Sequence, residues 1–129
     1  MMFRNTVTVY NSYEDDLKRV LLPKLLTGVH AEITRGAQQA ADGDKNTSKL
    51  LVIIPFKDII SSFKAPEEYD LLDDRSGCWT LKAGDIITIG DTGSAESYSQ
   101  LAERTAVFRI ESVSAFDFGT LPHWEVTAV

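Results

Sequence analysis

The chain has 129 residues, a length that fits one domain built around one hydrophobic core. Its 19 acidic and 13 basic residues give a formal charge of −6, and no basic run is longer than Lys18-Arg19. These values exclude a general binder of nucleic-acid backbones, which needs a cationic stripe, and no stretch approaches the roughly 18 apolar residues of a membrane span.

The cysteine content and the N-terminal sequence predict where the protein is made. Cys78 is the single cysteine, so no disulfide can form within the chain. The first ten residues, MMFRNTVTVY, lack an apolar segment long enough for a signal peptide. We therefore expect a protein made in a reducing cytoplasm.

The first third of the chain alternates with the period of β-strands. Thr6–Tyr10 predicts the first strand, and Val29–Thr34 resumes the same alternation after Gly28. Lys18–Leu26 is apolar enough for burial on one side, but Pro23 lacks the N–H that a central strand donates. We expect Lys18–Leu26 to lie at a sheet edge or at a bulge.

The middle of the chain contains a polar stretch followed by an apolar one. Gly36–Ser48 has no large apolar residue and therefore predicts an exposed, mobile loop. Lys49–Pro55 is a short run rich in valine and isoleucine, typical of a central strand. Ala65–Asp70 has a proline ahead of two acids, which is typical of the first turn of a short helix.

A turn between apolar segments follows. Trp79–Leu81 and Ile86–Ile89 flank Lys82–Asp85, a four-residue connection with a late glycine, so we predict a hairpin. Asp85 is interpreted as a turn residue whose carboxylate accepts hydrogen bonds from neighbouring backbone N–H groups.

The last third predicts a short helix and two strands. Ser94–Arg104 is compatible with a helix capped by Ser94. Ala106–Ala115 and His123–Val129 both alternate, and Phe116–Pro122 predicts the hairpin loop between them. We also expect the first and last strands of the chain to pair with each other.

About seven short strands and at most two short helices indicate a mainly β fold. The prediction is a single domain over residues 1–129, an antiparallel β-barrel or half-closed sheet with one or two short helices. The residues expected in its core are Trp79, Trp124, Phe108 and Ile110.

Each cluster of chemically active residues has a simpler structural interpretation. Asp42–Asn46 imitates the start of a calcium loop, but Thr47 and Ile53 stand where that loop needs a glycine and a bidentate acid. Gly90–Gly93 lacks the Gly-Lys-Ser/Thr ending of a phosphate loop. The acidic pairs, Glu67-Glu68 and Asp73-Asp74, are interpreted as solvated surface.

The nucleophile and metal-ligand candidates are equally sparse. His30 and His123, even with Cys78, are too few and wrongly spaced for a zinc site, and we interpret them as strand histidines beside aromatic rings. Cys78 is interpreted as a small buried residue next to Trp79. Ser94 lacks the second glycine of a G-x-S-x-G elbow. We therefore expect no catalytic, cofactor or metal site and no enzymatic activity.

The order of several short motifs resembles a family of phage proteins. These motifs are TVTVYNSYED near the start, L-x-G-V-H at Leu26–His30, LLVIIP at mid-chain, W-T-L-K-A-G-D at Trp79–Asp85 and P-H-W-E-V at Pro122–Val126. In this order they resemble small structural proteins encoded in the head-to-tail region of tailed bacteriophages and prophages, the minor capsid or head-closure-like proteins.

The resemblance implies a β-barrel protomer that forms a ring at the portal–tail junction. Its partners would be other copies of itself and phage portal or tail components, in the virion or the host bacterial cytoplasm, with no membrane and no sequence-specific nucleic acid. In this interpretation Gly36–Ser48 becomes ordered on assembly. An acidic protomer also suits a channel along which DNA slides without sticking.

The alternative is a small-ligand-binding β-barrel of a cytosolic bacterial protein. Such a barrel holds aromatic residues and few charges at its mouth. Tyr10, Tyr13 and His30 are the first candidates for residues at that mouth.

Overall fold

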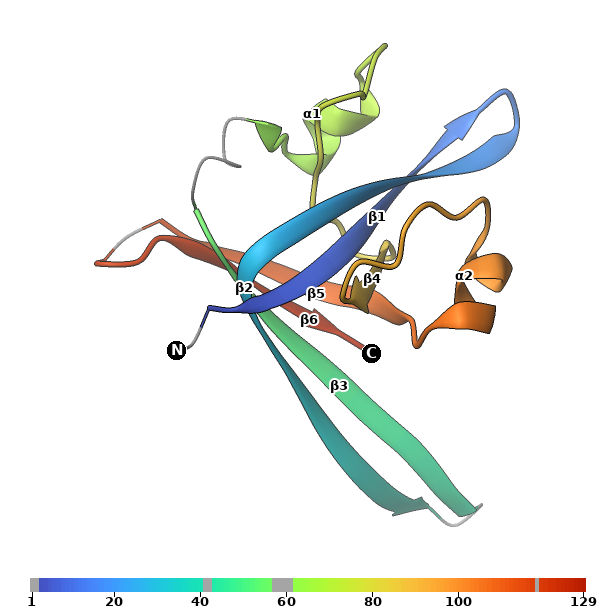
Figure 1. Ribbon diagram of the computed structural model, residues 1–129, viewed down its shortest axis with the longest axis vertical. Coiled ribbons are helices and arrows are strands. Elements are labelled where there is room, and N and C mark those ends of the chain that lie inside the picture. The colour runs from blue at the N-terminus through green and yellow to red at the C-terminus, as the bar shows by residue number, and fades with distance from the viewer. Residues whose placement is uncertain (1–2, 41–42, 57–61, 118) are drawn as a thin grey trace.

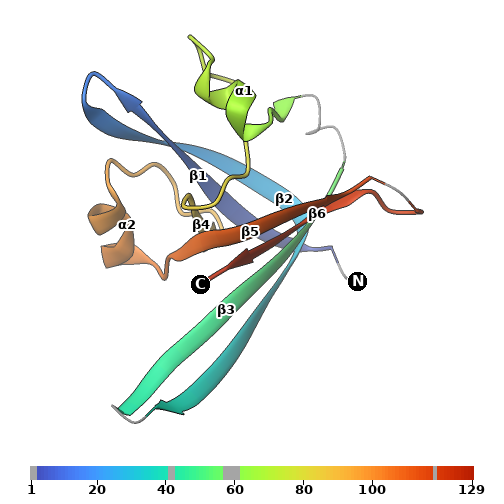
Figure 2. The same ribbon diagram turned by 180° about the vertical axis from the view of Figure 1, so that it is seen from behind.

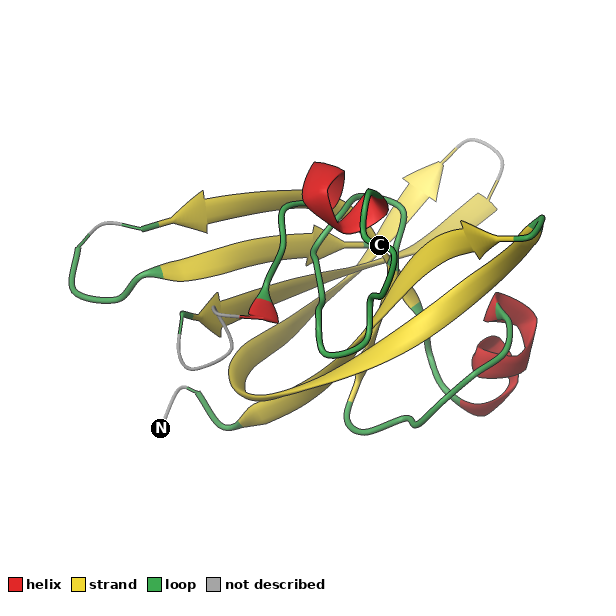
Figure 3. Ribbon diagram, turned by 90° about the horizontal axis from the view of Figure 1, so that it is seen from above, coloured by secondary structure: helices red, strands yellow, loops and turns green. Residues whose placement is uncertain are grey.

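The computed structural model describes residues 3–40, 43–56, 62–117 and 119–129, except for the side chains of residues 15 and 35–47. Six antiparallel strands close a barrel in the order β1-β2-β3-β6-β5-β4 (Figure 1). The elements are β1 Asn5–Asp15, β2 Lys18–Ala40, β3 Gly43–Pro55, α1 Pro66–Asp70, β4 Ile86–Ile89, α2 Tyr98–Arg104, β5 Phe108–Phe116 and β6 His123–Ala128. The two helices lie on different sides of the barrel (Figure 3). The predicted mainly β barrel with two short helices is confirmed.

The alternating sequence of the strands builds the core. Trp124, Val126 and Ala128 of β6 are all buried, while the residues between them are only partly covered. The rings of Trp79 and Trp124 meet edge to face with their centroids 5.4 Å apart, a favourable arrangement for aromatic pairs. The four residues expected in the core, Trp79, Trp124, Phe108 and Ile110, are buried, so that prediction is confirmed.

Pro23 lies in the part of β2 that pairs with one neighbouring strand, β1. Residues of β2 up to Val29 pair with β1, and pairing with β3 begins at His30. Because no described strand pairs with the other side of β2 at this point, the missing N–H of Pro23 breaks no hydrogen bond to a second strand. The predicted edge position of this segment is confirmed.

The predicted loop at Gly36–Ser48 is wrong, because most of it belongs to strands. Gly36–Ala40 continues β2, Gly43–Ser48 belongs to β3, and the two pair antiparallel from Arg35 opposite Ser48 to Ala40 opposite Gly43. The prediction was based on the lack of apolar side chains. The backbone N–H and C=O groups of paired strands, however, form hydrogen bonds with each other whatever the side chains are. The predicted mobility of this segment stays a prediction, and residues 41–42 lie outside the described residues.

The predicted hairpin around Lys82–Asp85 is only half right. The turn forms, with the Asp85 N–H donating to the Lys82 carbonyl at 3.3 Å. Trp79, however, forms a parallel bridge with Phe63, and β4 pairs with β1 and β5. The short β4 thus closes the barrel instead of pairing with the segment before the turn.

Two further predictions are corrected by the pairing and by the helix cap. The first and last strands do not pair, because β1 lies between β2 and β4 and β6 lies between β3 and β5. Helix α2 begins at Tyr98, and its cap is Ser97, whose hydroxyl accepts a hydrogen bond from the Gln100 N–H at 3.1 Å. Ser94 lies before the cap and offers its carbonyl to Arg104.

Candidate functional site

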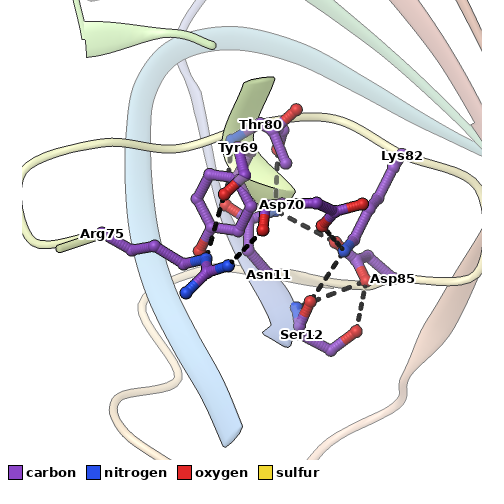
Figure 4. A network of polar contacts seen from close by, with 8 residues as sticks. All are labelled: Asn11, Ser12, Tyr69, Asp70, Arg75, Thr80, Lys82 and Asp85. Carbon is purple, nitrogen blue, oxygen red and sulfur yellow. Dashed lines mark hydrogen bonds and ion pairs between the residues drawn. The ribbon is translucent and has the colours of Figure 1, made fainter. Parts of the chain in front are cut away.

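Asp85 is the centre of a buried polar network. It is 2 % exposed, and its carboxylate accepts hydrogen bonds from the Ser12 N–H at 3.3 Å, the Ser12 hydroxyl at 2.7 Å and the Asn11 amide at 3.2 Å (Figure 4). Burial raises the pKa of Asp85 above its usual range. These partners belong to β1, so the prediction that Asp85 bonds to its neighbouring backbone is wrong.

Basic side chains extend this network to α1. Lys82 Nζ donates to the Ser12 carbonyl at 2.7 Å and forms an ion pair with Asp70 at 3.2 Å. Arg75 donates to the carbonyls of Tyr69 and Asp70 at 3.0 and 2.8 Å (Figure 4). Burial raises the pKa of Tyr69 to about 12. Together these contacts hold α1 and the following segment against β1.

A pocket of about 140 Å³ opens beside this network, between β1, β2, the start of β4, the start of α2 and β5. Tyr10 forms part of its wall with a fully buried side chain, and its hydroxyl is already bonded to Thr92 and to the Gly93 carbonyl. The residues that line the pocket are Tyr10, Ser12, Arg19, Leu21, Gly84, Asp85, Ile86, Glu96, Ser97, Tyr98 and Arg109. The pocket is therefore lined by both apolar and charged side chains.

The three residues named for a ligand barrel do not meet at one site. Tyr10 lines the pocket, whereas Tyr13 lies in another concavity with the Arg75 guanidinium 4.4 Å from its ring centroid. His30 lies 3.8 Å from the carboxylate of Glu32. The structure therefore does not bring these three candidates together in either of these two concavities.

The other candidate residues occupy structural positions. His123 stacks on Phe116 with ring centroids 5.1 Å apart and lies 3.2 Å from the Glu125 carboxylate, so its interpretation as a strand histidine beside an aromatic ring is confirmed. Cys78 is half-buried, which corrects its interpretation as a buried residue. Asp74 accepts two local hydrogen bonds from Ser76, which lower the pKa of its carboxyl. The described residues contain no cluster of three potential metal ligands.

The second candidate is the distal part of the β2–β3 hairpin. β1 pairs with β2 no further than Val29, and β6 pairs with β3 from Leu50 onward. Among the described residues, no third strand flanks Gly36–Ala40 or Gly43–Lys49. We call these two segments the arm. It projects from the barrel as a two-stranded ribbon (Figures 1 and 2).

Sequence reasoning missed the pocket because its lining comes from five separate segments of the chain, and no local pattern marks such a convergence. It missed the arm because it tested only for apolar side chains. Apolar and polar residues alternate only weakly over Gly36–Ser48. The sequence feature that could have predicted strands there is the strong strand pattern of the segments on either side.

Comparison with known proteins identifies the family of the chain. It belongs to DUF6751, a family of unknown function, whose sequence profile matches residues 2–129. No curated protein and no solved structure matches it. Within the described residues, every helix is too short or too polar to cross a membrane.

Proposed function

We propose that this chain is a non-enzymatic structural protein of a tailed bacteriophage or prophage, a minor capsid or head-closure-type assembly factor at the head–tail junction. Its partners are other copies of itself, arranged in a ring, and portal or tail components. Its place of action is the virion and the host bacterial cytoplasm.

The arm is the observation that carries this proposal. A two-stranded ribbon alone is marginally stable in water, and stability normally needs a third strand or a packed face. Both long edges of the arm are open among the described residues. Open edges and a sequence without large apolar residues suit a segment that gains its remaining contacts from a neighbouring subunit.

A ring would form if the arm contacts the barrel of its neighbour. The arm projects from one place on the barrel (Figure 2), and we propose that it contacts a different surface of the next copy and not the arm of that copy. Such a head-to-tail contact generates a closed ring when the rotation between subunits closes. The net charge of −6 supports a DNA channel, because an acidic wall repels phosphates.

Shortening the arm tests the proposal. Arg35 pairs with Ser48, so replacing residues 36–47 by Asn-Gly closes the hairpin with a two-residue turn and leaves the barrel intact. The control replaces Asp16-Leu17, which already has the positive φ angles of 54° and 67° that this turn type requires, by the same Asn-Gly.

Sedimentation velocity over a range of concentrations, alone and with the portal protein of the same genome, gives the readout. The full chain and the turn control are expected to self-associate or bind the portal, and the shortened chain to remain a folded monomer. A full chain that stays monomeric and unbound at every concentration contradicts the proposal. Equal association by the shortened chain shows that the arm is not the contact.

A further inference from the structure

The hydrogen-bonding groups around the 140 Å³ pocket leave mainly donors free. Arg109 uses one N–H, donated to the Gly84 carbonyl at 2.9 Å, out of the five that a guanidinium carries. Arg19 makes no side-chain hydrogen bond or ion pair with any described residue. The unused N–H donors of Arg19 and Arg109 therefore suit a ligand that accepts hydrogen bonds.

The acceptors of the pocket are mostly occupied. The Asp85 carboxylate already accepts three hydrogen bonds, from Ser12 and Asn11, and the charge of Lys82 acts on it. The Ser97 hydroxyl accepts from the Gln100 N–H. Glu96 lies exposed just before the Ser97 cap of α2, and it is the lining carboxylate whose oxygens have no hydrogen-bond partner among the described residues.

The remaining walls are apolar and limit the size of the ligand. Leu21 and Ile86 line the pocket and belong to a small apolar cluster with Tyr10. Arg109 is held with its guanidinium 5.4 Å from the ring centroid of Tyr98, a cation–π contact that positions it at the pocket. A cavity of about 150 Å³ holds one benzene molecule, so the pocket accommodates a body of that size.

We propose that this pocket binds a carboxylate carried on a short apolar body, with Arg19 and Arg109 holding the carboxylate and Leu21 and Ile86 contacting the body. A planar guanidinium pairs with a carboxylate through two parallel hydrogen bonds, which makes arginine suited to this role. The carboxylate has two sources of the same chemistry, a free small acid or an acidic side chain of a neighbouring subunit. Binding of a carboxylate in the pocket does not depend on the function proposed above, whereas the second source, a neighbouring subunit, rests on it.

Charge-matched probes test this site. Benzoate, benzamide and benzylamine share a ring and differ in charge, so each is titrated into the ¹⁵N-labelled full chain while amide chemical shifts are recorded. We expect benzoate to shift residues of the pocket in a saturable way and benzamide to bind more weakly. Stronger binding of benzylamine, which would point to Asp85 and Glu96 as the receiving groups, overturns the proposal, as does the absence of saturable shifts with benzoate.

Three variants locate the contact. Arg19→Gln and Arg109→Gln each remove a charge-assisted pair and are expected to weaken benzoate binding about tenfold or more. Arg4→Gln removes an exposed arginine that does not line the pocket and is expected to leave binding unchanged. Arg19 has no side-chain partner among the described residues, so Arg19→Gln remains informative if Arg109→Gln unfolds. Equal binding by Arg19→Gln and Arg4→Gln overturns the assignment of Arg19.

A competition experiment separates the two sources. If saturating benzoate reduces any self-association or portal binding seen by sedimentation, the natural occupant is an acidic side chain of a neighbour. If benzoate binds and leaves association unchanged, the ligand is a free acid. Because benzoate binding is measured by chemical shifts, its failure is distinguishable from the failure of assembly.

Discussion

Asp85 shows how one residue can serve both a turn and the packing of the barrel. Its backbone N–H closes the turn with Lys82, while its side chain reaches the N–H and hydroxyl of Ser12 on β1. A buried carboxylate is destabilising unless donors surround it, and these donors come from a strand more than 70 residues away in the sequence. The residue therefore fixes how the turn before β4 sits on β1.

The raised pKa of Asp85 gives a pH dependence of known sign. Protonated Asp85 is favoured more in the folded protein than in the unfolded chain, because burial raises its pKa above the ordinary value of 3.8. Its contribution to the free energy of unfolding is therefore largest below pH 3.8, falls as pH rises through the folded-state pKa and then levels off. Urea denaturation of the wild type and Asp85→Asn at several pH values measures this contribution as their difference.

Asp74→Asn is the control of opposite sign. Hydrogen bonds from Ser76 lower the pKa of Asp74, so its contribution is present above pH 3.8 and is lost as pH falls through the lower folded-state value. A wild-type advantage over Asp85→Asn that grows as pH rises would contradict the environment described for Asp85.

Helix α2 illustrates the difference between predicting an element and predicting its boundary. Ser94 and Ser97 are both good capping residues in the sequence, but it is Ser97 that has the extended backbone of a cap and accepts the Gln100 N–H. The side chain of Ser94 makes no hydrogen bond with the described residues, although its carbonyl receives one from Arg104.

The two serines make a matched pair of variants. Ser97→Ala removes the cap and is expected to lower the free energy of unfolding by about 1 kcal/mol. Ser94→Ala removes a hydroxyl that has no partner in the described part of the chain and is expected to change the free energy of unfolding by less than about 0.5 kcal/mol. Urea denaturation of both variants measures the difference, and an equal loss for the two would place the cap elsewhere.

Elements with strong alternation were predictable from the sequence, and long-range pairing was not. β6 follows from the alternation of Trp124, Val126 and Ala128, which needs only local residues. The partner of Trp79 did not follow, because its bridge to Phe63 depends on how distant segments pack. The strands of the arm were missed because burial was used as the criterion, and ribbons are held by backbone hydrogen bonds.

The candidate site was less predictable than the fold. The aromatic core residues could be predicted because large apolar residues in strands with alternating sequence are usually buried. The pocket combines Arg19 from β2 with Arg109 from β5, and nothing local to either arginine marks the pair. A polar pocket of this kind needs the closed barrel before its residues can be recognised.

At the scale of the whole molecule, the barrel supports itself and the arm does not. Every strand of the closed barrel has neighbours on two sides over part of its length, and the aromatic core fills its interior. Within the described ranges, the arm is paired through its own two strands and has no third strand beside it. This contrast underlies the proposal that the barrel is a scaffold and that the arm contacts other subunits.

Hydrogen–deuterium exchange of the arm, in dilute and in assembled protein, tests this claim most directly. Amides of Gly36–Ala40 and Gly43–Lys49 are expected to exchange fast in dilute protein, because a lone ribbon opens readily, and to become protected on assembly. Amides of β6 serve as the internal control and are expected to stay protected in both states. Arm amides that exchange at the same rate in dilute and concentrated protein, with or without the portal, would contradict the claim.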